Sequence, residues 1–337
     1  IHGQNDMRIG RTKNGEVQES PLKQQSSRNL QPSQVYQVYN DGWTLVVNGI
    51  HRRWPSVARL AASLEQDLDQ EIGINLYLTP PQDQGFPAHM DGHDVFILQL
   101  SGHKRWMVFP PNVELPLEAY KSNIPVPDDQ DCIVDAVIGP GHVLYIPRGF
   151  VHQAISQDDS SLHLTIGVHG YRWTDVVDEA LSVAAEKDVE FRRYYSRVIS
   201  SGKNNARTLQ RLLQKLAKLD LVDETLRRMA RRQVQRSHSV PDGHFAKLDM
   251  ARNIDLDAMV VHRTGLLSQV HCNNEKTYLE FGQDCISAPL NMEKAFRFVS
   301  ENSRFRIREL PDELTDESKQ VLAKRLVCEG LLTLETN

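Results

Sequence analysis

Paired cysteines are absent from this sequence. Four cysteines occur among its 337 residues, and none forms a Cys-x-x-Cys pair with another. So few scattered thiols in a chain of this size argue against a disulfide framework and fit a reducing compartment. His271, Cys272 and Cys285 could be imagined as zinc ligands, but no fourth partner stands at a usual spacing, so no zinc site is predicted.

Long apolar runs and a large excess of one charge are also missing. No apolar run approaches the roughly 20 residues that cross a bilayer. The net charge is −5, so the composition as a whole demands neither a nucleic acid nor a membrane as partner. Hydrophobic residues make up 40% and charged residues 25%, as in ordinary globular proteins. The length allows two or three domains, each with its own core.

The residue pattern of the first half of the sequence changes twice along the chain. Residues 1–34 are rich in Gln, Ser, Asn, Lys and Arg, which predicts a flexible arm. Strands are then predicted at 35–39 and 43–47, and a helix at 51–68. From residue 72 on, short segments rich in aliphatic, β-branched and aromatic residues alternate with Gly- and Pro-containing turns; they lie at 74–79, 95–100, 105–109, 142–146, 152–156 and 162–168. This pattern predicts an antiparallel barrel or sandwich of the cupin or jelly-roll kind.

The second half has a helical pattern. Thr174 is the predicted N-cap of a first helix, and an apolar stripe at helical spacing follows further on, formed by Leu209, Leu212, Leu213, Leu216 and Leu219. Residues 172–250 are therefore expected to form a helical bundle or a dimerisation module. The stretch 251–337 mixes helices and strands; Thr315 opens a helix that Gly330 closes, and a strand follows, which suits a winged-helix-like domain.

The sharpest chemical signal is the segment GFPAHMDGHDVFILQL. His89 and Asp91 are two residues apart, so on an extended backbone their side chains leave the same face. The segment PRGFVHQA supplies His152 after a further strand and turn. Two imidazoles and one carboxylate on one face of a metal form the facial triad of non-haem iron oxygenases. A His-x-Asp pair also arises by chance, with the histidine satisfied locally, but the surrounding strands favour the metal interpretation.

The segments NLYLTPPQDQGFPAHMDGHDVFILQLSGHKRW and GHVLYIPRGFVHQA resemble the JmjC-type ribosomal oxygenases, a family of cupin-like protein hydroxylases. The specific match covers about residues 72–180. The resemblance implies an α+β chain with a double-stranded β-helix oxygenase barrel, a helical dimerisation region and a winged-helix-like domain. We therefore expect four parts: a flexible arm (1–34), a JmjC/cupin oxygenase domain (35–171), a helical dimerisation region (172–250) and a winged-helix-like domain (251–337).

The resemblance also implies chemistry and partners. It implies Fe(II), 2-oxoglutarate as cosubstrate and O2, and the hydroxylation of an arginine or histidine side chain in a ribosomal protein by a homodimer. The expected location is the cytoplasm or, in a eukaryote, the nucleus or nucleolus. Two other interpretations remain open: hydroxylation or demethylation of another peptide or protein, and a cupin that binds a metal without catalysis.

Further site residues follow from the resemblance where the positions match. Lys104, fifteen residues after His89, would pair with the distal carboxylate of 2-oxoglutarate. Asn75 and Thr165 would hydrogen-bond the same cosubstrate, and Tyr77 would line the site. Without the resemblance, each would be taken as an ordinary strand residue. His163 is either an outer neighbour of the site or a satisfied core histidine.

Two positions depart from the family pattern. Cupin-like motifs commonly read Gly-Asp in the turn before the third ligand, where this sequence has Gly141–His142; this position is not a ligand, so the metal prediction stands. The histidine-hydroxylating relatives carry a Ser two residues after the Thr, where this sequence has Gly167. That glycine weakens the expectation of a histidine target.

The stretch Lys203–Arg236 is strongly basic, with ten basic residues against three acidic ones. A basic helix can contact the phosphates of RNA near a ribosomal target. Such a stretch is more often a solvated helix face, and no aromatic residue interleaves with it for base stacking.

Overall fold

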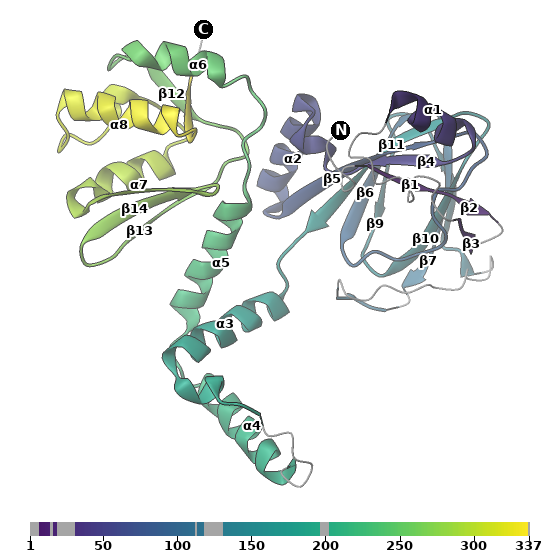
Figure 1. Cartoon of the computed structure of the whole chain (residues 1–337), viewed down its shortest axis with the longest axis horizontal. Helices are drawn as coiled ribbons and strands as arrows, with labels where there is room; N and C mark the ends of the chain where they lie inside the picture. Colours follow the sequence, from purple (N-terminus) through teal and green to yellow (C-terminus); the bar gives the residue numbers. More distant parts are fainter. Residues whose placement is uncertain are drawn as a thin grey trace. The chain divides into compact units, whose positions relative to one another are not determined.

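The computed structural model describes residues 7–13, 16–18, 31–111, 113–117, 131–195 and 202–335 (Figure 1). The chain divides into two compact units, residues 1–170 and 171–337. In the described part of the chain, no helix combines the length and the apolar composition that crossing a membrane requires.

The first unit is built on two antiparallel sheets (Figure 1). The larger has the strand order β1 (Met7–Gly10), β4 (Thr44–Val47), β5 (Glu71–Thr79), β11 (Ser161–His169), β6 (Asp94–Ser101) and β9 (Val143–Ile146). The smaller has the order β10 (Phe150–Ser156), β7 (Lys104–Pro111) and β8 (Val134–Ile138). The hairpin β2 (Thr12–Lys13) and β3 (Glu16–Val17) and the helices α1 (Pro32–Asn40) and α2 (Pro55–Leu68) complete the unit. The predicted barrel of the cupin kind is confirmed.

The central strands β5 and β11 carry apolar residues on one face and polar residues on the other. Ile72, Ile74, Leu164 and Ile166 pack with Ala61 of α2 in one apolar core. Because side chains alternate along a strand, Asn75, Tyr77 and Thr79 leave the opposite face of β5, and the paired residues Thr165, His163 and Ser161 leave that face of β11. The apolar pattern therefore anchors the strands against α2 and turns their polar residues toward the inside of the barrel.

The beginning of the chain differs from its prediction. Residues 7–10 form strand β1, which pairs with β4 in the larger sheet, although the composition of residues 1–34 had predicted a flexible arm. The pairing partner is about forty residues away in the sequence, so local composition could not reveal it. Residues 1–6, 14–15 and 19–30 lie outside the described part of the chain.

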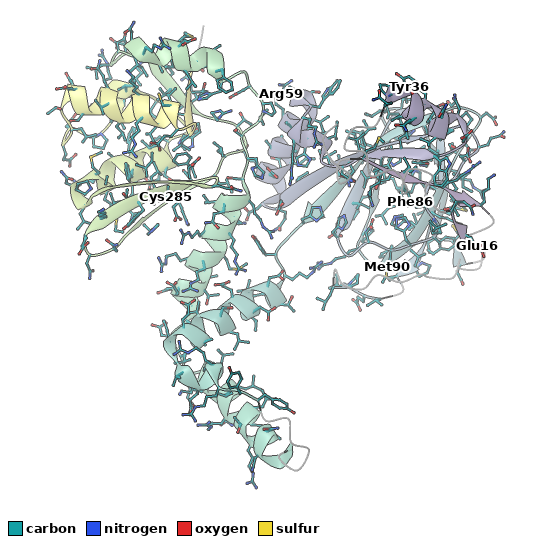
Figure 2. All side chains as sticks on the ribbon, viewed as in Figure 1. Glu16, Tyr36, Arg59, Phe86, Met90 and Cys285 are labelled. Carbon is teal, nitrogen blue, oxygen red and sulfur yellow. The ribbon has the colours of Figure 1, made fainter. Side chains whose placement is uncertain are left out.

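The strand predicted at 35–39 is wrong, because these residues lie in helix α1. Pro32 begins the helix and Gln31 forms a reciprocal capping box with Gln34. Val38 is buried, whereas Tyr36 is exposed (Figure 2). Tertiary packing of one helical face thus overrides the β propensity of Val and Tyr.

The second unit begins with three long helices and ends in a mixed region. The helices are α3 (Trp173–Lys187), α4 (Gly202–Leu216) and α5 (Val222–Arg236). The mixed region contains α6 (Phe245–Met250), β12 (Met259–His262), β13 (Ser268–Cys272), β14 (Lys276–Phe281), β15 (Asp284–Pro289), α7 (Glu293–Glu301), β16 (Arg304–Arg306), α8 (Asp316–Cys328) and β17 (Leu332–Leu334). Its strands form two three-stranded antiparallel sheets over a core that includes Phe281, Phe296 and Leu326.

Helix ends in this unit test two of the predicted caps. Thr315 is the N-cap of α8, with its hydroxyl accepting the Ser318 N–H, and Gly330 follows the helix with a φ of 86°. Thr174, in contrast, lies inside α3. The cap residue is Arg172, whose N–H donates to the Asp175 carboxylate at 2.6 Å. The Asp175 carboxylate in the first turn, rather than the Thr174 hydroxyl, therefore accepts the backbone N–H at the start of the helix.

Candidate metal centre and its cavity

His89 and His152 are brought together by a local backbone bridge. His89 lies in the segment between β5 and β6, and His152 lies on β10; each backbone N–H donates to the other's carbonyl, at 3.1 and 2.8 Å. The two rings lie 4.4 Å apart between centroids. In the sequence, His89 stands between Phe86 and Met90. Figure 2 shows both of these residues in the first unit, and Met90 is buried. The predicted pair from distant segments therefore meets at one point of the barrel.

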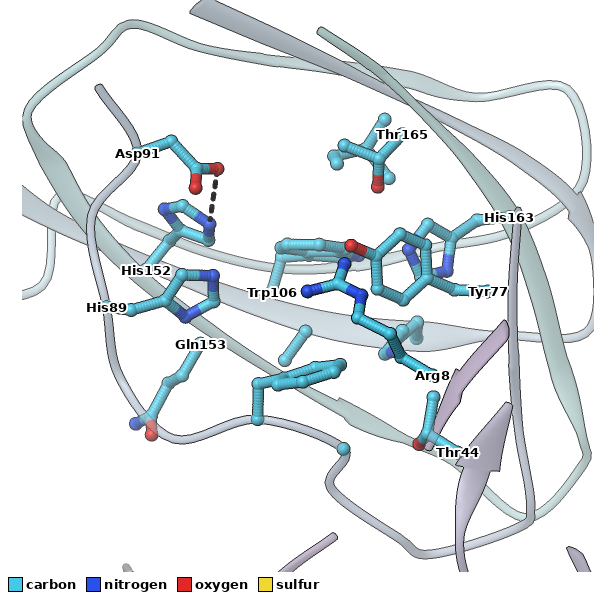
Figure 3. A pocket seen from close by; sticks show the side chains of 15 residues that line it. Arg8, Thr44, Tyr77, His89, Asp91, Trp106, His152, Gln153, His163 and Thr165 are labelled. Atoms are coloured by element: carbon cyan, nitrogen blue, oxygen red, sulfur yellow. Dashed lines mark ion pairs between the residues drawn. The ribbon is translucent and has the colours of Figure 1, made fainter. Parts of the chain in front are cut away.

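The three predicted ligands converge. One donor atom from each of His89, Asp91 and His152 lies within 4.8 Å of the others. The Asp91 carboxylate is 3.7 Å from His152 Nε2 (Figure 3). His89 Nδ1 is 2.8 Å from the Pro87 carbonyl and His152 Nδ1 is 3.1 Å from that of Phe150. Donation from both Nδ1 atoms leaves the two Nε2 lone pairs for a metal.

Burial sets the protonation state of His152. Desolvation, followed by the neighbouring His89, lowers the pKa of His152 to about 4, so the imidazole is neutral at pH 7. A neutral imidazole is the form that binds a metal. Two imidazoles and one carboxylate fit the donor set of a non-haem Fe(II) centre.

The triad lies at one side of a cavity of about 210 Å³ (Figure 3). The cavity is lined by the side chains of both sheets and of the segment before β6. They are Arg8, Thr44, Tyr77, Gly85, Phe86, His89, Asp91, Ile97, Lys104, Trp106, His152, Gln153, Ala154, His163 and Thr165.

Lys104, which the resemblance predicts to pair with 2-oxoglutarate, lines this cavity. Its side chain is 4% exposed, and its ammonium donates to Thr79 Oγ1 at 3.0 Å. In the described part of the chain no carboxylate lies within ion-pair distance of it. Burial lowers the pKa of Lys104 to about 7. A buried lysine without an acidic partner is costly, and a bound anion would remove that cost.

Tyr77, Thr165 and His163 also line the cavity. The rings of Tyr77 and His163 stack at 4.9 Å, and burial raises the pKa of Tyr77. His163 is buried, and its Nδ1 has no hydrogen-bond partner. Burial and then the neighbouring Lys104 hold the pKa of His163 well below its usual value. His163 is therefore not a core histidine satisfied by the protein, which was one of its two interpretations.

Asn75 differs from the other predicted cosubstrate residues. It pairs with Thr165 in the β5–β11 register, but its Oδ1 accepts the Gly49 N–H at 2.9 Å. It is not among the residues that line the cavity. Its contact with a cosubstrate stays a prediction.

Several cavity residues were missed from the sequence. Trp106 shares a strand face with Lys104, and its buried Nε1 has no partner, so the two-residue spacing was a usable signal. Phe86 lies within the motif segment, three residues before His89. Arg8 and Thr44 come from β1 and β4, whose pairing no local pattern revealed.

Gly167 is tightly enclosed. A Cβ atom at this position would lie 2.8 Å from His93 Cδ2 and 3.0 Å from His169 Nε2. These two histidine rings stack at 4.4 Å between centroids. A serine could not replace Gly167 without moving at least one of the rings. His142 lies on the β8–β9 turn, where Nδ1 is 2.8 Å from the Gly139 carbonyl, and is not a cavity residue.

The comparisons with known proteins agree with this geometry. Residues 50–176 match the family described as the JmjC domain. Ribosomal oxygenase 1 of Homo sapiens is 37% identical over 171 residues, which are 48% of this chain and 26% of that protein. The bifunctional lysine-specific demethylase and histidyl-hydroxylase NO66 of Drosophila persimilis is 34% identical over 161 residues, 47% of this chain and 23% of that protein. The chain thus spans about a quarter of the length of these relatives.

A solved structure extends the likeness in fold. The ribosomal oxygenase YcfD of Escherichia coli covers 98% of this chain and 86% of its own, with a TM-score of 0.56 and 19% identity. The barrel and its triad thus define a cupin-type JmjC domain. Residues 50–176 thus match the JmjC domain family, and the chain is similar to the JmjC-type ribosomal oxygenases that its motifs resemble.

Proposed function

We propose that this protein is an Fe(II)- and 2-oxoglutarate-dependent oxygenase that hydroxylates an arginine or histidine side chain of a protein, with a ribosomal protein as its target. One observation carries the proposal: a facial triad and a buried lysine without an acidic partner line the same cavity. The name of the human relative, ribosomal oxygenase 1, and an E. coli YcfD structure in complex with cobalt and 2-oxoglutarate support it.

Residues on one side of the cavity would bind the metal, and residues on the other would bind the cosubstrate. The Nε2 atoms of His89 and His152 and the Asp91 carboxylate would hold the metal, leaving its remaining positions free. Lys104 would pair with the far carboxylate of the cosubstrate. With Fe(II), 2-oxoglutarate and O2 bound, the centre would supply oxidative decarboxylation of the cosubstrate coupled to hydroxylation of a C–H bond.

Neighbouring side chains orient the same anion. Trp106 Nε1 and His163 Nδ1 are buried cavity-lining groups without partners, so a ligand oxygen that reaches them restores hydrogen bonds lost on folding. Thr165 offers a hydroxyl on the same face of β11 as His163. The Phe86 ring contributes an apolar wall that excludes water from the reacting centre.

The same residues argue against a cupin that only binds a metal. Such a protein gains nothing from an unpaired buried lysine, which costs stability. Demethylation of another protein uses the same centre, and the name of the Drosophila relative includes that activity. It therefore stays an alternative, distinguished by the product: formaldehyde from a methylated lysine, but not from hydroxylation of an unmethylated residue.

We propose that the helices of the second unit form a homodimer interface and that residues 251–337 are a winged-helix-like domain. Trp173, Val177 and Leu181 recur every four residues on α3 and are 82%, 55% and 45% exposed. Leu209 and Leu213 of α4 are 59% and 56% exposed. Large apolar side chains on successive helical turns favour a protein partner.

The basic stretch does not support RNA contact. Six of its ten basic residues form ion pairs within the chain: Arg211, Lys215, Arg227, Arg228, Arg231 and Arg232. Arg228, for example, bridges Glu186 of α3 to Glu224 of α5. Charges already neutralised by carboxylates release few counterions from a nucleic acid. Arg228 and Arg232 pair α5 with α3, Arg211 and Lys215 pair α4 with the segment after α3, and Arg231 pairs α5 with β14. We infer that these ion pairs hold the elements of the second unit together.

Metal binding tests the centre independently of any substrate. Titration with Co(II), followed by its visible absorption, is expected to show one site per chain in the parent and a large loss of affinity in His152→Ala. His142→Ala is the matched control, because His142 is a histidine of the same unit that does not line the cavity. Equal Co(II) affinity of His152→Ala and the parent would exclude the proposed centre.

A further inference from the structure

Arg8 of strand β1 is a cation at the solvent-exposed mouth of the cavity. Arg8 is an exposed residue of β1, and it lines the cavity. In Figure 3 its guanidinium points into the cavity beside the Tyr77 ring, toward the side where His89 and His152 lie. No assigned function of the metal centre uses this residue.

The position of Arg8 is fixed by its surroundings. Its Nε donates to Asn48 Oδ1 at 3.1 Å, and its guanidinium carbon lies 5.9 Å from the centre of the Phe86 ring. The Tyr77 ring lies beside it in the cavity. The guanidinium is thus held by one amide and two aromatic residues, and its remaining N–H groups are free to meet a ligand.

The strand itself is fastened to the segment that carries His89. A Cβ atom on Gly10 would lie 2.7 Å from the Phe86 ring and 2.8 Å from the Gly85 carbonyl, so only glycine allows this close approach. The Thr12 N–H donates to the Gln84 carbonyl at 2.7 Å. β1 therefore places Arg8 at a fixed distance from the metal ligands.

Positively charged side chains outnumber carboxylates around the cavity. Among the described residues that line it, Arg8 and Lys104 are cations, and Asp91 is the one carboxylate. Asp91 is committed to the metal and Lys104 to the cosubstrate under the proposed function. In the described part of the chain no carboxylate lies within ion-pair distance of Arg8. An arriving arginine or lysine side chain would therefore meet a cation and find no acid to pair with.

We propose that Arg8 reads the target side chain at the mouth of the cavity, and that it admits a side chain that accepts a hydrogen bond and carries no positive charge. Of the two targets that the proposed function leaves open, the imidazole of histidine meets this requirement, whereas the guanidinium of arginine does not. The inference rests on the proposed function and narrows it, because that function leaves arginine and histidine open as targets.

The first experiment identifies the target residue type without assuming the target. Protein from cells that lack the gene is incubated with the purified protein, Fe(II), 2-oxoglutarate and ¹⁸O₂, and the labelled residues are mapped by mass spectrometry. The expected label lies on a histidine. Label on arginine overturns the inference and leaves the proposed function intact, whereas label on any residue other than histidine or arginine overturns both. Absence of label from all proteins contradicts the proposed function, and the inference falls with it.

The second experiment tests Arg8 itself on two peptides that span the labelled site and differ in the target residue, native in one and arginine in the other. The parent is expected to bind the native peptide about tenfold or more tightly, since like charges placed together are strongly unfavourable. Arg8→Glu is expected to abolish or reverse this preference. Lys13→Glu, a charge reversal at an exposed residue of the β2–β3 hairpin that follows β1, should leave the preference unchanged. An unchanged preference in Arg8→Glu overturns the inference.

Discussion

Replacing Lys104 by methionine should make the ligand-free protein more stable and at the same time less able to bind its cosubstrate. The methionine side chain has a similar length and carries no charge. Lys104 is 4% exposed, its one hydrogen bond is to Thr79, and burial lowers its pKa from 10.5 to about 7. The substitution therefore removes a group that the folded protein holds at a cost.

The magnitude follows from the two pKa values. The unfolded chain holds Lys104 with its ordinary pKa of 10.5, and each pKa unit between the two states corresponds to about 1.4 kcal/mol. At pH 7 the cost of Lys104 to the folded state is therefore on the order of 4 kcal/mol. Loss of the hydrogen bond to Thr79 returns about 1 kcal/mol of this, and Thr79 keeps its contact with Thr44. The expected net gain is about 3 kcal/mol.

The sign of the pH dependence is specific to this cause. Between pH 7 and 10.5 the unfolded chain binds more protons at Lys104 than the folded protein does, so the stability of the parent rises with pH. The advantage of Lys104→Met should therefore be largest at pH 7 and below and shrink by about 1.4 kcal/mol per pH unit above it.

Denaturant unfolding of the ligand-free parent and variant at pH 7, 8 and 9 measures both effects. Lys319→Met is the control, because Lys319 is also 4% exposed but donates to Asp312 and to the Arg308 carbonyl. That substitution should destabilise the protein by about 1–3 kcal/mol. A Lys104→Met variant that is less stable than the parent at pH 7, or whose advantage does not change with pH, would refute the reasoning.

Three further outcomes are expected. Binding of 2-oxoglutarate should weaken by about tenfold per pH unit above pH 7, because the anion needs protonated Lys104; calorimetric affinities that stay constant from pH 7 to 9 would contradict this. Gly167→Ser should lower stability by about 1–3 kcal/mol in thermal unfolding through contact with His93 and His169, and His93→Ala should restore part of the loss; a Gly167→Ser variant as stable as the parent would exclude the overlap. Light scattering should give twice the 38.4 kDa of one chain for the parent and a single chain for the double variant Val177→Glu, Leu181→Glu; a parent of 38.4 kDa would exclude the dimer.

The strands of the barrel could be predicted because their signals are local. The segments expected at 74–79, 95–100, 105–109, 142–146, 152–156 and 162–168 correspond to β5, β6, β7, β9, β10 and β11. Each has apolar or alternating residues between Gly- and Pro-containing turns, so each can be recognised without its partner. The same holds for His89 and Asp91, whose spacing on an extended backbone is visible in three letters of sequence.

Cavity residues whose positions depend on pairing between segments far apart in the sequence could not be predicted. Arg8 reaches the cavity because β1 pairs with β4, and the residues around Arg8 carry no pattern that announces a strand. Asn75 shows the opposite case: its strand was predicted, but its side-chain oxygen accepts the Gly49 N–H. Side-chain direction within a barrel depends on competing partners, which a sequence motif does not contain.

The account depends most on the triad as an oxygenase centre, and formation of succinate from 2-oxoglutarate tests this directly. We expect the parent to form succinate in the presence of Fe(II) and O2 and to stop when Fe(II) is removed by a chelator. His89→Ala and Asp91→Ala should form none, whereas His142→Ala should match the parent. Succinate formation by His89→Ala and Asp91→Ala at the rate of the parent would contradict the account.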